Sequence, residues 1–217
     1  TVAGGTLTNT EDCPSNVFAT WNKLVAQGDT FTNGNTTIAR GGASWRGGFS
    51  TIGLPSTGKF YWEVKLSTGT NARIGITDDR AGSAIDLQNR GQASELGEQT
   101  SSVSLAQNGS ANINTSQTSN YSASFTSSNI IGVAADMTNM KLYYSKDGVF
   151  QNSGVPTSGS TGTGALSIPA SSNTYFPGVS VNASGYHVNF GNGTFGTTAV
   201  SSAGSNASGI GIFEYDV

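Results

Sequence analysis

Few residues of this chain are of the types that carry out covalent chemistry. His187 is the single histidine and Cys13 the single cysteine. His187 alternates with Tyr186 and Val188, so we expect it on the outward face of a strand, without the neighbours that a catalytic triad or a histidine metal site requires. Nothing in the sequence beside Cys13 would lower the pKa of its thiol. We therefore expect structural or surface roles for both residues.

Glu95 and Glu98 form the one near pair of glutamates. Glycosidases place two carboxylates about 5–10 Å apart across a sugar ring. Here both residues lie in a Gly-, Ser- and Gln-rich stretch, and Glu63 belongs to a predicted strand. A glycan-degrading enzyme is therefore the remote alternative, and we predict that the chain is not an enzyme.

Asp78, Asp79 and Asp86 could hold a cation such as calcium. Their spacing lacks the alternating oxygens, the glycine and the distal glutamate of an EF-hand loop. A solvated turn explains these residues better, so no metal is predicted. The glycine-rich stretches contain no phosphate-binding motif after a strand, and no cofactor is predicted.

Aromatic residues provide the remaining candidates, because sugars bind flat aromatic faces beside amide and hydroxyl groups. Alternation along the predicted strands directs Trp62 and Tyr144 into the core. The residues left for an exposed ligand-binding surface are Trp45, Arg46, Tyr61 and Tyr143. The alternative, which we favour, is that these aromatic residues cover a second sheet face or contact another subunit.

The elements that position these residues are predicted to be strands. Of 217 residues, 11% are charged and 30 are glycine, a composition poor in helix formers and rich in turn formers. The net charge is −3 with no cluster of Lys or Arg, so no nucleic-acid partner is predicted. No window of about 18 apolar residues is present, so no membrane insertion is predicted.

Period-two alternation marks the strands. In residues 59–66, Phe60, Trp62, Val64 and Leu66 should face inward, and the alternate side should be wet or half-covered. Residues 72–77 repeat the pattern with Ala72, Ile74 and Ile76 inward, and the apolar run 130–137 should be a central strand. Further strands are predicted at 141–145 and 210–215, with a final pair at 175–181 and 186–190. Tight turns are predicted at 33–34 and 146–149.

Three regions are less regular. Residues 16–27 carry a helical pattern that competes with a strand and turn. Residues 98–129 and 152–173 are too polar to bury and should form surface loops or edge strands. The whole pattern predicts a single all-β domain, an antiparallel β-sandwich of the concanavalin-type jelly-roll class. We expect an arm and first element at 1–29, the sandwich at 30–195, and a polar linker with a terminal strand at 196–217.

Several blocks occur in the order found in the SPRY domain family. The chain resembles that family through residues 58–64, 73–76, Tyr121 and Phe125, 130–136, 141–148, 175–180 and 188–191. Asp147-Gly148 stands where the family usually has Asn-Gly, which keeps the turn chemistry. The resemblance implies a sandwich that binds partners through variable loops, here at 78–98, 98–129 and 152–173.

The Asn, Ser, Thr and Gly bias and the segment 13–22 are most similar to SPRY-type structural proteins of tailed, often marine, bacteriophages. This similarity implies a non-enzymatic virion surface protein, either a fibre or tail component or a capsid decoration protein. Its partners would be other virion proteins or copies of itself, reached through terminal strands, and it would lie on the virion outside the host cell after synthesis in the host cytoplasm. The alternative is a host-receptor or carbohydrate-binding module.

Overall fold

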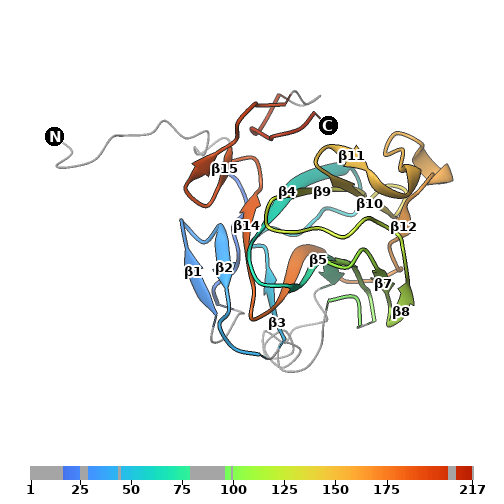
Figure 1. The fold of residues 1–217 in the computed structure, drawn as a ribbon. Coiled ribbons are helices and arrows are strands. Elements are labelled where there is room, and N and C mark those ends of the chain that lie inside the picture. The colour runs from blue at the N-terminus through green and yellow to red at the C-terminus, as the bar shows by residue number, and fades with distance from the viewer. Residues whose placement is uncertain are drawn as a thin grey trace, which may run out of the picture.

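A computed structural model describes residues 17–24, 29–43, 45–78, 96–98, 100–204 and 209–216. Two antiparallel sheets make up the fold (Figure 1). The eight-stranded sheet runs β1(Thr30–Thr32), β2(Thr37–Ala39), β14(Gly185–Asn189), β4(Lys59–Thr68), β9(Ile130–Asp136), β10(Lys141–Lys146) and β11(Val149–Phe150), with β12(Leu166–Ser167) also paired to β10. The six-stranded sheet runs β3(Arg46–Phe49), β13(Tyr175–Asn182), β5(Asn71–Asp78), β6(Ser102–Ala106), β7(Ala111–Ile113) and β8(Ser116–Thr118). β15(Thr194–Phe195) and β16(Thr198–Ala199) form a separate hairpin.

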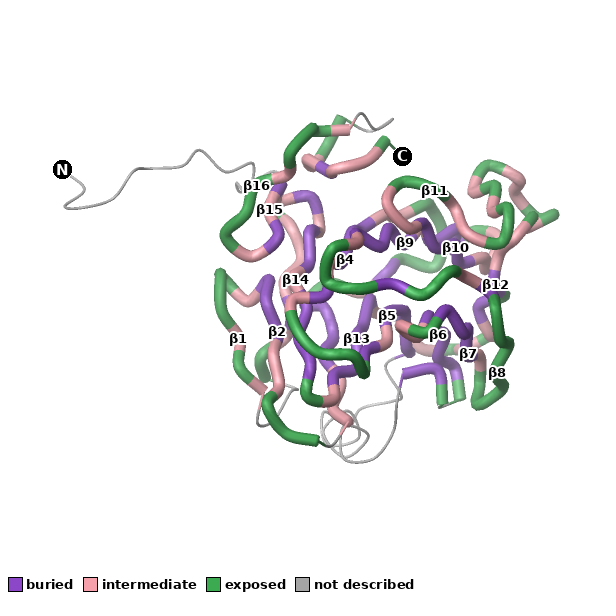
Figure 2. Tube along the Cα trace, viewed as in Figure 1, coloured by how far each residue is buried: buried purple, intermediate pink, exposed green. Residues whose placement is uncertain are grey.

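The predicted alternation is confirmed on the inner side of both sheets. Trp62, Val64 and Leu66 of β4 are buried in one core with Ile74 and Ile76 of β5, and Phe60 packs against it. The Tyr144 hydroxyl of β10 donates to the Ile74 carbonyl at 3.0 Å, which joins the two sheets. Figure 2 shows buried residues concentrated along the facing strands. The sandwich architecture is therefore confirmed.

The turn chemistry is also confirmed. Asp147 and Gly148 both have positive φ and join β10 to β11, with Lys146 paired to Val149. The turn between β1 and β2 likewise has positive φ at Asn33, Gly34 and Asn35. β9 lies between β4 and β10, as its continuous apolar run predicts.

The structure settles four points of the expected secondary structure. Residues 17–24 follow the strand-and-turn alternative and contain no helix: the Trp21 N–H donates to the Asn35 carbonyl, and Trp21 forms a bridge with Ser50. The prediction of surface loops or edge strands at 98–129 holds for β8, an exposed edge strand, but not for β6, an interior strand whose Ser102 and Ser104 are buried. β13 and β14 are not a pair, because the 182–185 connection crosses from one sheet to the other.

The fourth correction concerns the predicted terminal strand at 210–215. Residues 209–216 contain isolated bridges from Ile212 to Asn192 and from Phe213 to Gly204, and no strand. The segment lies back on the chain's own eight-stranded sheet, above β4 and β9 in Figure 1. It is therefore not the free pairing strand that the sequence suggested.

Candidate interaction surface

The four predicted ligand-binding residues do not form one site. Tyr61 and Tyr143 both pair with Ala134, one from each side, so they share the outer face of the eight-stranded sheet. Trp45 and Arg46 lie at the start of β3 in the other sheet. The four residues therefore lie in two separate pairs with different surroundings.

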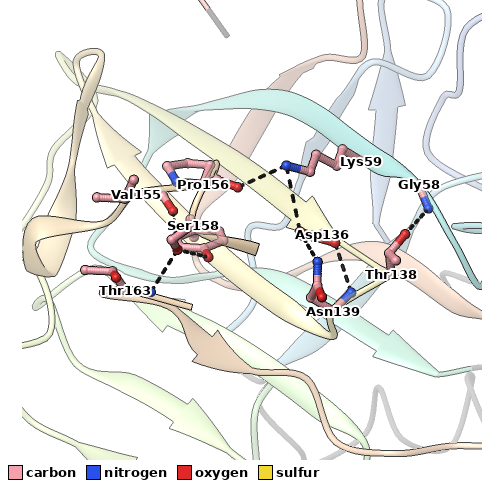
Figure 3. A network of polar contacts seen from close by, with 10 residues as sticks. Gly58, Lys59, Asp136, Thr138, Asn139, Val155, Pro156, Ser158 and Thr163 are labelled. Atoms are coloured by element: carbon pink, nitrogen blue, oxygen red, sulfur yellow. Dashed lines mark hydrogen bonds and ion pairs between the residues drawn. The ribbon is translucent and has the colours of Figure 1, made fainter. Parts of the chain in front are cut away.

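Tyr143 is fully buried, which overturns its predicted exposure. The 155–163 segment covers it, and Figure 3 shows the polar contacts that hold this segment. Lys59 Nζ donates to the Pro156 carbonyl at 3.3 Å, and Ser158 Oγ lies 3.3 Å from the Tyr143 hydroxyl. The 3₁₀ turn Gln151–Ser153 precedes this segment, and the 3₁₀ turn Gly159–Thr161 lies within it.

Tyr61 is covered as well. The ring of Phe213 packs edge-on against it, with centroids 5.1 Å apart and planes at 80°. Burial, and then the neighbouring Glu63 carboxylate, raise the pKa of the Tyr61 phenol, so the hydroxyl stays protonated and donates to Glu63 Oε1 at 3.3 Å. Tyr61 is therefore half-buried beneath the C-terminal segment, where it has a structural role.

Glu63 is the residue that sequence reasoning missed. Its strand face was predicted to be wet or half-covered, yet Glu63 is 0% exposed. The backbone N–H of Glu214 donates to Oε2 at 2.9 Å and that of Tyr215 to Oε1 at 3.0 Å. Asn189 Nδ2 donates to Oε2 at 3.1 Å. Burial raises the pKa of Glu63, while these hydrogen bonds act in the opposite direction.

Gly132 provides the space for this cluster. It pairs with Glu63 on one side and with Ser145 on the other, at the centre of the sheet. A Cβ atom at Gly132 would lie 2.4 Å from both the Tyr61 hydroxyl and Ser145 Oγ. A side chain here would displace the polar groups around the carboxylate. A glycine opposite an outward Glu was the signal available in the sequence, but it depends on the strand register, which alternation does not give.

The outer face of the six-stranded sheet is also covered. Leu96 is buried on it, and its backbone N–H donates to Ser180 Oγ at 2.7 Å. Ser104 Oγ donates to the Leu96 carbonyl at 2.6 Å, and the Gly97 N–H donates to Ser102 Oγ at 3.1 Å. Serines on β6 and β13 thus bind the 96–98 segment to the outer face of the six-stranded sheet.

One end of the sandwich brings three connections of the described chain together. There the connections at 40–43, 69–71 and 182–184 meet, through bonds from Ala183 N to the Gly42 carbonyl and from Ser184 Oγ to the Asn71 carbonyl. The connection that follows β2 runs along the bottom of Figure 1. We call this surface the loop rim and define it as residues 40–43, 45–46, 69–73, 182–184 and Glu98.

Trp45 is the half-buried aromatic residue of the loop rim. The Arg73 guanidinium lies 5.7 Å from its ring centroid, within cation–π range. Arg73 Nη2 also pairs with Glu98 Oε1 at 2.9 Å, and Nη1 donates to the Leu96 carbonyl at 3.1 Å. Glu98 is thus engaged in an ion pair, and its predicted catalytic partner Glu95 lies outside the described residues.

Arg46 points toward the interior of the sandwich. It pairs with Val181, a core residue, so it lies on the inner side of β3 at the sandwich opening. Nearby, Arg40 Nη1 pairs with Asp29 Oδ1 at 3.1 Å. Burial raises the pKa of Asp29, and the charges of Arg40 and Arg46 oppose that shift. The loop rim therefore brings the Trp45 ring together with Arg73 and the Glu98 carboxylate.

The other candidate residues do not assemble into a site. Asp78 Oδ2 accepts from Ser171 Oγ at 2.7 Å, while Asp79, Asp86 and Cys13 lie outside the described residues. Within the described part of the chain, no group of three or more His, Cys, Asp or Glu residues could hold a metal. In the same residues, no helix is long and apolar enough to cross a membrane.

His187 is half-buried on the outer face of the eight-stranded sheet, which agrees with its predicted orientation. Its Nδ1 lies 2.8 Å from Thr37 Oγ1, and Asn33 Nδ2 donates to that same hydroxyl. Burial, and then the Lys65 charge, lower the pKa of His187. The imidazole is therefore kept neutral by its surroundings, in a structural position.

The family model described as SPRY domain matches residues 59–193. The chain belongs to the SPRY domain family. The crystal structure of the SPRY domain of human HERC1 matches at 13% sequence identity, covering 77% of this chain and 96% of that chain with a TM-score of 0.58. This likeness concerns the fold alone. Among curated proteins, none matches the sequence. SPRY membership indicates a protein-interaction module.

Proposed function

We propose that this SPRY domain binds a partner protein through the loop rim. Both outer sheet faces are occupied by the chain itself, one by residues 96–98 and the other by residues 155–163 and 212–215. The observation that carries the proposal is the half-buried Trp45 ring beside Arg73 and Glu98. Tryptophan and arginine dominate the residues that contribute most to protein–protein binding.

The partner, in this proposal, is another virion protein of a tailed bacteriophage, and the chain is a fibre, tail or capsid decoration component on the virion surface. Supporting this are the Asn-, Ser-, Thr- and Gly-rich composition and the similarity of residues 13–22 to phage SPRY-type proteins. The loop rim does not include residues 210–215, which lie on the chain's own eight-stranded sheet, so this proposed interface does not use them.

Two measurements test the proposal. Immunogold electron microscopy with an antibody against this chain should label the surface of intact phage particles, and unlabelled particles that contain the chain would refute a surface location. Carboxylate-to-amine cross-linking of the particles, read by mass spectrometry, should join Glu98 of the loop rim to one virion protein. Cross-links confined to the opposite end of the sandwich would refute the loop rim.

The rim residue itself is tested on the partner so identified. Trp45→Ala should weaken binding by at least about tenfold, the range of an interface hot spot. Ile52→Ala is the matched control, because Ile52 is an exposed apolar residue beyond the other end of β3 and should leave affinity unchanged. Equal affinities for Trp45→Ala and the native chain would contradict the assignment.

A carbohydrate-binding module is the second candidate, since an accessible Trp45 face could stack on a sugar. Arg73 already lies over the ring, which leaves less aromatic surface for a sugar. A glycan array separates the two candidates. Binding to one sugar class that is lost in Trp45→Ala would favour the carbohydrate module over the protein partner.

A further inference from the structure

Residues 212–215 of the C-terminal segment are bound to the eight-stranded sheet mainly through their backbone N–H and C=O groups. Its contacts join residues about 150 positions apart in sequence: the amides of Glu214 and Tyr215 donate to Glu63 with separations of 151 and 152 residues. The Ile212 carbonyl accepts from Asn189 Nδ2 at 2.9 Å, and its N–H donates to the Gly191 carbonyl at 2.8 Å. The segment thus fills a preformed site on β4 and β14.

This site recognises features that any copy of the segment carries. Glu63 binds two consecutive backbone N–H groups with its two oxygens, a recognition of backbone geometry and not of a side chain. Selectivity comes from the aromatic ring that precedes them, because Phe213 packs edge-on against Tyr61. A second copy of the chain supplies the same ring and the same amides in the same order.

The C-terminal segment is bonded to residues 201–204. Gly204 donates its N–H to the Phe213 carbonyl at 2.7 Å, and the Ser201 N–H donates to Glu214 Oε2 at 2.6 Å. The Ser201 hydroxyl also bonds to Glu214 Oε1. We call residues 201–204 and 209–216 together the C-terminal flap. These bonds join the two parts of the flap to each other independently of their contacts with the sheet.

The connection to the sandwich is suited to a hinge. Thr198 and Ala199 of β16 are exposed, and Val200 is held by one backbone bond to Gly193 at 3.0 Å. Residues 200–204 are Val, Ser, Ser, Ala and Gly, all with small or short side chains. Exchange of an identical element between copies costs little when its contacts are remade in full in the partner.

We propose that the Glu63 site is an interaction surface for a second copy of this chain, which inserts its C-terminal flap in place of the resident one. The product is a symmetric dimer in which each flap donates the Glu214 and Tyr215 amides to Glu63 of the other copy. The hinge lies between β16 and Ser201. This proposal is independent of the loop rim, since none of its residues belongs to that surface.

Complementary variants test the exchange. Glu63→Gln impairs the site and leaves the flap intact, whereas Phe213→Ala impairs the flap and leaves the site intact. Each full-length variant and a mixture of the two are warmed briefly at high concentration and cooled, and native mass spectrometry measures the species formed. The mixture should gain a heterodimer of twice the 22.2 kDa chain mass, because only a mixed pair combines an intact flap with an intact site.

The controls separate exchange from general association. A chain that carries both substitutions, mixed with either single variant, should form no such heterodimer. If Glu63→Gln does not fold by circular dichroism, Tyr61→Ala replaces it as the impaired site. Folded variants that remain monomeric on mixing would overturn the proposal, as would a heterodimer that forms equally with the doubly substituted chain.

Discussion

The two outer sheet faces are both covered by the chain, but by different chemistry. Over the eight-stranded sheet, the C-terminal flap is fastened by one buried carboxylate that collects two backbone amides and an asparagine. Over the six-stranded sheet, Leu96 is fastened by neutral hydroxyls of Ser104 and Ser180. One carboxylate accepts several hydrogen bonds on the first face, whereas separate serines each make one hydrogen bond to Leu96 on the second. A single substitution should therefore lower the free energy of unfolding more at Glu63 than at either serine.

The largest expected effect is at Glu63. Replacing it in Glu63→Ala leaves the Glu214 and Tyr215 amides and Asn189 Nδ2 without their acceptor, and each buried unsatisfied donor costs about 1–3 kcal/mol. We expect a loss of about 3 kcal/mol in the free energy of unfolding, measured by urea denaturation. Lys65→Ala, two residues along the same strand face, is the control and should change stability by less than about 0.5 kcal/mol.

A loss at Glu63 comparable to that at Lys65 would mean that the flap is not held by the carboxylate. Glu63→Gln separates the loss of hydrogen-bond acceptors from the loss of side-chain volume, because the amide keeps the size of the side chain but offers one acceptor oxygen instead of two. Its loss should lie between those of Glu63→Ala and the native chain.

A smaller effect is expected on the other face. Ser104→Ala removes the donor to the Leu96 carbonyl and should cost about 1 kcal/mol, the net contribution of one buried hydrogen bond. Ser116→Ala on the exposed edge strand β8 is the matched control and should be neutral. The same urea series measures both. If Ser104→Ala costs as much as Glu63→Ala, the proposed contrast between the two faces fails.

The smallest effect expected is a pH dependence of the free energy of unfolding from His187, which pairs with Lys65 on the outer face of the eight-stranded sheet. Burial and Lys65 lower the pKa of His187 in the folded state, so the unfolded chain, in which a histidine titrates at about 6.5, binds the proton more readily. Stability is therefore lost as the pH falls below about 6.5 and towards the folded pKa.

Comparison with His187→Gln isolates this contribution. The native chain should lose stability relative to His187→Gln between pH 7.5 and pH 5.5, measured as the shift in urea midpoint. A native chain that gains stability over the variant in this range would contradict the neutral imidazole beside Thr37.

Alternation was sufficient to predict the core and insufficient to predict what lies outside it. The period of two assigns Trp62 and Val64 to the interior correctly, because an apolar side chain on a strand has one favourable face. The opposite face of the same strand was predicted to be wet, yet Glu63 is fully buried. Periodicity identifies the side of a residue, but the cover over that side comes from segments distant in sequence.

The prediction that residues 98–129 are too polar to bury was wrong for β6, for a related reason. Ser102 and Ser104 in β6 are buried because their hydroxyls bond to the 96–98 segment, and no local rule distinguishes such serines from those of a surface loop. The candidate site shows the same limit: Trp45 remains partly exposed as predicted, whereas Tyr143 is closed by the 155–163 segment. The predictions for Cys13, Asp79, Asp86 and Glu95 concern residues outside the described part of the chain and stay predictions.

The carboxylate of Glu63 has a consequence for deuterium labelling. The amide hydrogens of Glu214 and Tyr215 are bound to an acceptor inside the protein, so they can exchange with solvent only when this attachment opens. Their exchange rates would report the release of the whole segment from β4 and β14, and would slow or quicken together.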